Sequence, residues 1–395
     1  MLEKLFKKSD DSIVLRNYTK LPQSTGGSDL DIAIPQDKFK EVEEILFQTA
    51  KEQQGYLVSF IPSKSCPKYC FQGDNWGLQI DLFIGGVSFN EQMIFPFALM
   101  EKYTIEHHSI NVLESSCANV IAFIKELLNN LSCKESYFED FVTSRNEVLM
   151  TNLLAPLFSE KLIKNLQSMQ SYDKEVIHNL GIKARKELGI SAFSIFKNKV
   201  PNIMKRLSSQ PGYSIAFLGT DGSGKSTIID AITPILNEAF HKSVYYEHMR
   251  PNKLPSIARL LGRKEDFGSP VTDPHAQKQS GFVGSLFRFS YYYLDYTLGY
   301  FLKIFPKKSF KSCIWIFDRY YYDYLLDQKR ARIKLPVFVI KLGAFFMPKP
   351  DMIICLGTDA EKIYARKPEI SFEEIERQVK ALKEFSSQNK RAVWI

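Results

Sequence analysis

The sequence of 395 residues lacks several patterns that identify large classes of protein. None of its six cysteines forms a C-x-x-C pair, and the closest pair, Cys66 and Cys70, has no histidine nearby. This spacing disfavours a zinc site or a disulfide framework, and we expect reduced thiols in a cytoplasmic protein. The N-terminus has no apolar run after its basic residues, so it predicts no signal peptide.

Long uninterrupted apolar runs are also missing. The two most apolar stretches, residues 281–305 and 335–348, are interrupted by charged side chains, and we expect core helices there, with no transmembrane segment. The net charge of +8 is mild, and phosphate ligands account for it as well as nucleic acid does. Without C2H2 spacing, an RNP motif or a long basic run, the sequence does not point to a nucleic-acid partner.

The length and the hydrophobic content of 45% favour two globular domains. The dipeptide Pro211-Gly212 marks a break. We expect an N-terminal α/β domain over residues 1–115, a helical extension over 116–210, and a second α/β domain over 211–395. In the last domain, short apolar runs alternate with helical patterns, which predicts a parallel sheet covered by helices on both faces.

A phosphate-binding loop stands out in the second domain. The segment GTDGSGKS satisfies G-x-x-x-x-G-K-[S/T] between a predicted strand and a predicted helix. Lys225 would reach the β- and γ-phosphates and Ser226 would ligate Mg²⁺, so we predict ATP and Mg²⁺ as ligands. The alternative is a Gly-rich turn with a surface lysine. The expected ATP-binding residues are Gly219, Thr220, Gly222, Ser223, Gly224, Lys225, Ser226 and Thr227.

Two further features near this loop carry charge. Asp221 lies inside the loop, where a carboxylate is unfavourable unless it points toward a second substrate or a metal ion. The strand SCIWIFD ends in Asp318, followed by Arg319. The acid can hold Mg²⁺ or accept a proton, and the arginine can clamp the acceptor or the transferred group. A strand end with a surface ion pair is the alternative.

Residues 213–395 resemble the thymidylate kinase family. Its loop reads G-x-D-G-x-G-K-[S/T]-T, as GTDGSGKST does here, and its third strand ends in D-R-[Y/F/H], as Asp318, Arg319 and Tyr320 do. The resemblance implies that Asp221 approaches a hydroxyl of the acceptor and that Arg319 binds acceptor phosphate. After D-R-Y, however, the family's thymine-reading run is replaced by YYDYLLDQKR, which puts thymine recognition in doubt.

Other basic residues receive roles from the same resemblance. Arg250, in EHMRPN, stands where the family has an R-E-P signature and would bind the acceptor. Arg366 and Lys367 fit the basic lid residues of the family and would stabilise charge on the transferred phosphoryl group as catalytic residues. In each case a solvated side chain is the alternative.

A polar stripe on the long aromatic helix around residue 290 suits an acceptor with hydroxyl groups. Arg288, Tyr292 and Asp295 are spaced so that they share one face. We predict Arg288 and Asp295 as acceptor-binding residues, because buried charged groups require partners. A buried Arg/Asp pair that locks two helices explains the pattern equally well.

Three acids in the N-terminal domain suggest a metal site. Asp29 and Asp31 lie on one side of a predicted strand, and Asp81 would add a third carboxylate from a neighbouring strand. Such a group needs divalent metal, and a two-metal site suits nucleotidyl transfer. Residues 12–111 resemble the nucleotidyltransferase superfamily that includes DNA polymerase beta, although Arg16 and Asn17 replace its Gly-Ser turn. A degenerate structural domain is the alternative.

The leading hypothesis is a Mg-ATP-dependent phosphotransferase of the thymidylate-kinase-like type, fused to a nucleotidyltransferase-like domain. Its acceptor would be a small molecule such as a nucleotide, sugar or sugar phosphate, and the fusion is similar to proteins of bacterial surface polysaccharide loci. The alternatives are a nucleoside monophosphate kinase with a regulatory domain and a nucleotide-sensing or toxin-like module. The oligomeric state, a homodimer included, stays open.

Overall fold

The computed structural model describes residues 2–8, 11–260, 275 and 278–395, and the chain separates into two compact units. Unit 1 comprises Met1–Ser208 with Glu238–Lys242, and unit 2 comprises Ser209–Asn237 with Ser243–Ile395. The predicted helical extension therefore belongs to the same compact unit as the predicted N-terminal domain.

Unit 1 contains a mixed seven-stranded sheet in the order β3-β4-β5-β2-β1-β9-β8. β2 pairs with β5 in parallel and β1 pairs with β9 in parallel, whereas the other pairs are antiparallel. The strands of the unit are β1 (Ile13–Val14), β2 (Leu30–Ile34), β3 (Tyr56–Ile61), β4 (Lys68–Gln72), β5 (Gly77–Ile84), β6 (Gly86–Phe89), β7 (Gln92–Pro96), β8 (Thr104–His107) and β9 (Ile110–Leu113).

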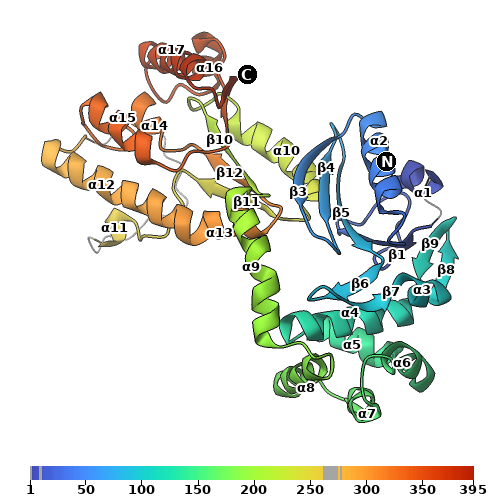
Figure 1. Cartoon of the computed structure of the whole chain (residues 1–395). Helices are drawn as coiled ribbons and strands as arrows, with labels where there is room; N and C mark the ends of the chain where they lie inside the picture. Colours follow the sequence, from blue (N-terminus) through green and yellow to red (C-terminus); the bar gives the residue numbers. More distant parts are fainter. Residues whose placement is uncertain (1, 9–10, 261–274, 276–277) are drawn as a thin grey trace. The chain divides into compact units, whose positions relative to one another are not determined.

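Successive side chains along each strand point to opposite faces of this sheet and contribute to two hydrophobic cores. Ile32 and Ile34 of β2 pack with residues of α1 and α2, whereas Ala33 joins the core formed with α4 and the helices after it. Figure 1 shows α4 to α8 gathered on the side of β6 and β7. The helices are α1 (Leu2–Lys8), α2 (Phe39–Glu52), α3 (Phe97–Met100), the 3₁₀ turn η1 (Glu101–Tyr103), α4 (Ser115–Asn130), α5 (Glu135–Ser144), α6 (Glu147–Leu154), α7 (Glu160–Ser168), α8 (Lys174–Glu187) and α9 (Ala192–Ser208).

Unit 2 contains a five-stranded sheet in the order β11-β12-β10-β13-β14, and every pair is parallel. The parallel sheet predicted from the sequence is present. The elements are β10 (Tyr213–Leu218), α10 (Lys225–Ala239), β11 (Val244–His248), α11 (Ile257–Leu260), α12 (Phe282–Gly299), the π-helical segment η2 (Tyr300–Ile304), α13 (Phe305–Phe310), β12 (Ile314–Asp318), α14 (Asp323–Leu326), α15 (Val337–Phe346), β13 (Met352–Cys355), α16 (Ala360–Arg366), α17 (Phe372–Gln388) and β14 (Ala392–Trp394).

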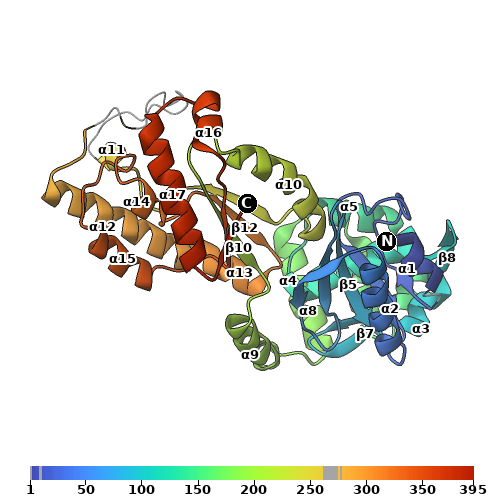
Figure 2. The same ribbon diagram turned by 90° about the horizontal axis from the view of Figure 1, so that it is seen from above.

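Both faces of this sheet are covered. Ala216 and Leu218 of β10 pack on one face with residues of α12 and α17, whereas Phe217 packs on the other face with Ile229 of α10. Figures 1 and 2 show α10 apart from the group formed by α12, α14 and α15. The arrangement leaves the carboxyl ends of β10, β12 and β13 at one edge, where ligands of parallel sheets bind.

The two apolar stretches expected to be core helices do form helices, mainly α12 and α15, but much of their apolar surface is exposed. Of the described residues in α15, only Ile340 is buried, while Phe338 and Phe345 are about 70% exposed (69% and 71%). The apolar periodicity predicted both helices correctly, but the rest of unit 2 covers only one side of each helix. Among the described residues, no helix is long and apolar enough to cross a membrane.

Candidate active site

The phosphate-binding loop connects β10 to α10, in the strand-to-helix context that the motif requires. Gly222 has a φ of +85° and Gly224 a φ of +94°, a region that side-chain-bearing residues rarely adopt. A Cβ atom on Gly222 would also lie 3.1 Å from the Cβ of Lys367. Both glycines are therefore needed for the backbone to turn its N–H groups inward.

Lys225 is the first residue of α10 and is buried beneath this loop. Its Nζ donates hydrogen bonds to the carbonyl oxygens of Gly219 (2.9 Å) and Thr220 (2.8 Å). Burial, and then the charge of Arg319, lower the pKa of Lys225 to about 8. The lysine is thus held next to the loop as a cation that releases its proton more easily than a solvated lysine does.

Asp318 ends strand β12, which pairs with β10 so that Asp318 stands opposite Phe217. One carboxylate oxygen, Oδ2, accepts a hydrogen bond from the Tyr246 hydroxyl at 3.1 Å and lies 3.4 Å from His248 Nδ1. Burial raises the pKa of Asp318, but the hydrogen bond with His248 and the charge of Lys225 outweigh it, and the net shift is downward. The other oxygen, Oδ1, is buried without a hydrogen-bond partner among the described residues.

Arg319 has a φ of 72°, which is uncommon for a residue with a long side chain. Its backbone N–H donates to the carbonyl of Phe217 at 2.9 Å, and its buried guanidinium donates to Asp221 and Asp323, each at 2.6 Å. Although burial lowers the pKa of Arg319, the two carboxylates raise it further than burial lowers it. Unusual backbone conformations of this kind occur where the surrounding structure imposes them, often at functional sites.

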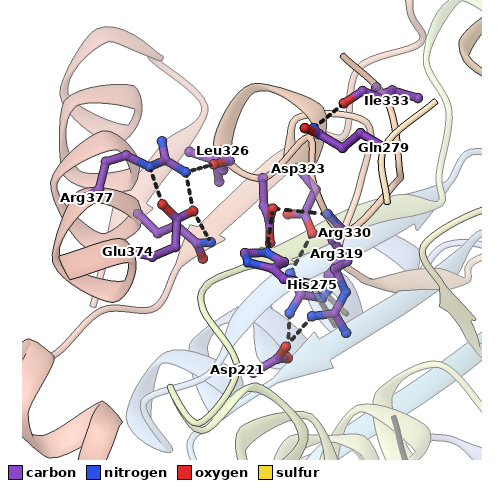
Figure 3. Close-up of polar contacts among 12 residues, drawn as sticks. Asp221, His275, Gln279, Arg319, Asp323, Leu326, Arg330, Ile333, Glu374 and Arg377 are labelled. Atoms are coloured by element: carbon purple, nitrogen blue, oxygen red, sulfur yellow. Dashed lines mark hydrogen bonds and ion pairs between the residues drawn. The ribbon is translucent and has the colours of Figure 1, made fainter. Parts of the chain in front are cut away.

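Asp221 lies between two guanidinium groups, those of Arg319 and Arg330 (Figure 3). Burial raises the pKa of Asp221, but these two charges dominate and hold it well below its usual range. The carboxylate therefore stays ionised and orients two cations beside the phosphate-binding loop. Its predicted contact with an acceptor hydroxyl stays a prediction.

Arg330 and Asp323 were not predicted from the sequence. Asp323 pairs with Arg319 four positions earlier, but Arg319 lies before α14 with a φ of 72°, so the i, i+4 rule for helices does not predict this pair. Arg330 lies beyond α14 in an irregular segment, and its pairing with Asp221 joins residues 109 positions apart. No local pattern in the sequence reveals a contact of that kind.

These residues line a cleft of about 800 Å³ within unit 2. The cleft brings together the loop, the end of β12, and Arg366 and Lys367 at the end of α16. Lys367 also lies 3.0 Å from the carboxylate of Glu369. The lining residues include the cations Lys225, Arg319, Arg330, Arg366 and Lys367, the acids Asp221 and Asp318, His248, and the exposed hydroxyl residues Ser226 and Thr227.

The other predicted acceptor-binding residues lie outside the lining of this cleft. Arg250 donates to the buried carboxylate of Asp295 at 3.0 Å and lies over the ring of Tyr292 at 4.5 Å. Arg288 donates to the Tyr292 hydroxyl at 3.3 Å. Asp295 also accepts from the backbone N–H of Leu254 at 2.7 Å, so the pair ties the segment after β11 to α12. Asp295 is thus in a buried Arg/Asp pair, but its partner is Arg250 in the segment after β11, whereas the alternative drawn from the sequence was a pair that locks two helices.

A further group of polar residues lies near the cleft in Figure 3. Ligand atoms of His275, Asp327 and Glu374 lie within 4.8 Å of one another. However, His275 Nε2 already contacts both Asp327 oxygens at 2.9 and 3.0 Å, and Glu374 accepts hydrogen bonds from both Arg377 and Gln378. The carboxylates are thus satisfied by protein donors, and we interpret the group as an ion-pair network.

The three predicted acids of unit 1 do converge. Asp31 and Asp81 stand opposite each other on β2 and β5, and carboxylate oxygens of Asp29, Asp31 and Asp81 lie within 4.8 Å of one another. Burial raises the pKa of Asp81, although Lys68 opposes the shift. One oxygen of Asp31 is buried without a hydrogen-bond partner among the described residues. The three acids therefore converge as predicted, and their binding of a metal ion stays a prediction.

Two basic side chains already contact this cluster. Arg16 pairs with Asp31 and lies 3.7 Å from Asp29, and Lys68 pairs with Asp81. The guanidinium of Arg16 also contacts the hydroxyl of Tyr137 on α5. Arg16 therefore supplies a cation directly to two of the three acids.

Comparison with known protein families and with curated proteins finds no match to this chain. Among solved structures, a thymidylate kinase from Ehrlichia chaffeensis is similar over 47% of this chain and 86% of its own, with 18% sequence identity and a TM-score of 0.32. A similarity at this level does not assign an activity.

Proposed function

We propose that unit 2 is an ATP-dependent phosphotransferase. The observation that carries this proposal is the single cleft in which the phosphate-binding loop meets Asp318, Arg319, Arg366 and Lys367. A binding module needs the loop alone, whereas this cleft surrounds the position of a terminal phosphate with cations from three other segments. Fixed cations of this kind stabilise the charge that develops during phosphoryl transfer.

The chain's own groups have distinct roles in such a reaction. The loop amides and Lys225 bind the donor phosphates, and Arg366 and Lys367 neutralise the transferred group. Arg319 orients the acceptor end, with Asp221 and Asp323 holding its guanidinium in place and Arg330 pairing with Asp221. Transfer forms a bond between the acceptor oxygen and the terminal phosphorus as the bond to ADP breaks, and the proton of the acceptor is released.

The cleft also fits a divalent cation. Asp318 carries a buried oxygen with no hydrogen-bond partner among the described residues, and it stays ionised because its pKa is lowered. The buried hydroxyls of Thr220 and Ser223 are likewise without partners among those residues. Mg²⁺ held by Asp318 and Ser226 would supply Lewis-acid neutralisation of the donor phosphates.

The acceptor is a small hydroxyl-bearing molecule such as a nucleotide, a sugar or a sugar phosphate. Its use in bacterial surface polysaccharide synthesis, and equally the alternative of a nucleoside monophosphate kinase, rests on sequence resemblance. The purified chain, incubated with Mg-ATP and panels of nucleoside monophosphates, sugars and sugar phosphates, should release ADP with at least one acceptor. Lys225→Ala should lower that release by about 10³-fold or more, because it removes charge stabilisation in the transition state.

A matched control is Lys383→Ala, an exposed lysine of the same unit outside the cleft lining, which should leave ADP release unchanged. If no acceptor stimulates ADP release above the Lys225→Ala background, the kinase proposal fails and nucleotide sensing becomes the better account.

For unit 1 we propose a second candidate function, metal-dependent nucleotidyl transfer, because Asp29, Asp31 and Asp81 converge there. Acids this close repel one another unless cations neutralise them, and two divalent ions suit that chemistry. Pyrophosphate release from each NTP measures the activity. Loss of that release in Asp29→Asn with Asp31→Asn supports the assignment, and unchanged release removes it.

A further inference from the structure

Helices α12 and α15 present an unusually apolar surface. The two helices are neighbours, because a Cβ on Gly343 of α15 would lie 3.1 Å from Phe289 of α12, and the backbone N–H of Lys334 donates to Ser285 at 2.9 Å. Figures 1 and 2 both show them side by side. We call the exposed apolar residues of these helices and η2 the α12/α15 face: Phe282, Val283, Leu286, Phe287, Leu294, Phe301, Leu302, Val337, Phe338, Leu342, Phe345 and Phe346.

The exposure on this face is high for large apolar side chains. Val283 is 80% exposed, and Phe346 is 69% exposed. Along α15 the exposed residues recur at spacings of three to four, from Phe338 through Leu342 to Phe345, so they form one continuous stripe. Contiguous apolar patches of this kind are rare on soluble proteins and indicate a contact with another surface.

The charge around the face has one sign. The segment 331–349 contains four basic residues, Arg332, Lys334, Lys341 and Lys349, and no acid. The segment 281–311 contains a single acid, Asp295, which is buried against Arg250. Lys341 and Lys349 are exposed, Lys341 within the stripe of α15 and Lys349 three residues beyond its end.

We propose that the α12/α15 face docks on the surface of an anionic phospholipid bilayer. Phenylalanine and leucine side chains enter the boundary between headgroups and acyl chains, and the lysines contact the anionic headgroups. A second copy of the chain is a poorer occupant, because it would bring the same exposed lysines together. Charge complementarity therefore selects the lipid surface over self-association.

Flotation of the full-length protein with vesicles tests the proposal. The protein should float with vesicles of equal parts phosphatidylserine and phosphatidylcholine, and it should float far less with pure phosphatidylcholine. Raising the salt concentration should weaken binding, because the electrostatic part is screened.

Paired substitutions test the surface itself. Phe338→Ser with Phe345→Ser should lower vesicle affinity about 10-fold per phenylalanine. Phe193→Ser with Phe196→Ser is the matched control, because these α9 residues are 75% and 65% exposed and the helix is also basic. The control should bind vesicles as the unmodified chain does. Lys341→Gln and Lys349→Gln should each lower affinity for the anionic vesicles about fivefold, with little effect on neutral ones.

Three outcomes would overturn the proposal. One is equal flotation of the unmodified and Phe338/Phe345 proteins, with both shown to be folded by circular dichroism. Another is loss of binding in the α9 control alone. The third is a concentration-dependent dimer by light scattering that the α15 substitutions dissociate, with no vesicle binding, which would identify a second copy as the occupant.

Discussion

Each unit contains a cluster of buried acids neutralised by basic side chains, but the clusters differ in the space beside them. In unit 2, Asp221 and Asp318 border a cleft of about 800 Å³. In unit 1, the cavity lined by Arg16 and Asp31 is about 30 Å³. A cavity of that size holds about one water molecule, whereas the cleft accommodates a ligand as large as a nucleotide.

The two clusters therefore differ in what their basic side chains can bind. Around the phosphate-binding loop, basic side chains outnumber acidic ones and line the open cleft. An anionic ligand can therefore pair with these basic side chains without disrupting the fold. In unit 1, Arg16 and Lys68 contact the carboxylates directly, so a metal ion must displace them or bind beside them. The two clusters should therefore differ in how much stability is lost when a basic residue is removed, and in whether a metal ion restores it.

The largest effect is expected for Arg319→Met. The substitution leaves the buried carboxylate of Asp323 without its partner, and we expect a loss of about 3–5 kcal/mol in the free energy of unfolding. Urea denaturation measures it. Arg366→Met, in the same cleft, is the control and should change stability by less than about 0.5 kcal/mol. Equal losses in both variants would show that the pairing of Arg319 is not structural.

A smaller loss, roughly 1–2 kcal/mol, is expected for Lys68→Met, because Lys68 is half-buried against Asp81. Mn²⁺ should restore the stability of this variant, because the three acids then lack the positive charge of Lys68. An ion at 100 times its Kd contributes about 2.7 kcal/mol to the free energy of unfolding. Melting temperatures with and without Mn²⁺ provide the measurement. Adding Asp81→Asn should abolish the response, and a Mn²⁺ effect that persists there would place the ion elsewhere.

The pH dependence of activity and of stability should report the titration of Lys225. In the proposed reaction its charge contacts the donor phosphates. Since its pKa in the free protein is about 8, kcat/KM for ATP should fall about tenfold per pH unit above pH 8. Stability should change in the opposite direction. Between pH 8 and about 10.5 the unfolded lysine binds more protons than the folded one, so the free energy of unfolding rises with pH.

The variant Lys225→Arg distinguishes the titration of Lys225 from that of other groups, because arginine stays charged throughout this pH range. A decline in kcat/KM above pH 8 that survives in Lys225→Arg would assign the titration to another group.

The smallest effect on stability is expected for Arg330→Gln, less than about 1 kcal/mol, because Asp221 keeps its contact with Arg319. The substitution should raise KM for the acceptor several-fold and leave KM for ATP unchanged. Combined with Asp221→Asn, it should show a coupling energy of about 0.5–3 kcal/mol in a double-mutant cycle. Additive effects would mean that the two residues act independently.

Local patterns predicted a large part of this site. The glycines, Lys225 and the position of Asp318 follow from one motif and from the end of one strand, because both depend on neighbouring residues. Arg330 could not be predicted, since its approach to Asp221 depends on how the segment after α14 folds back. Arg250 and Asp295 were both predicted to bind the acceptor, and only the structure showed that they pair with each other.

The sequence alone determined that the apolar stretches 281–305 and 335–348 are helical, that the second unit has a parallel sheet, and that a Gly-rich loop links its first strand to a helix. Tertiary structure decided which charges meet and which surfaces stay open. Periodicity shows which residues share a face of α15, but not whether another element covers that face. Burial and pairing are properties of distant segments brought together, and this is why the cleft and the exposed α12/α15 face emerged only from the folded chain.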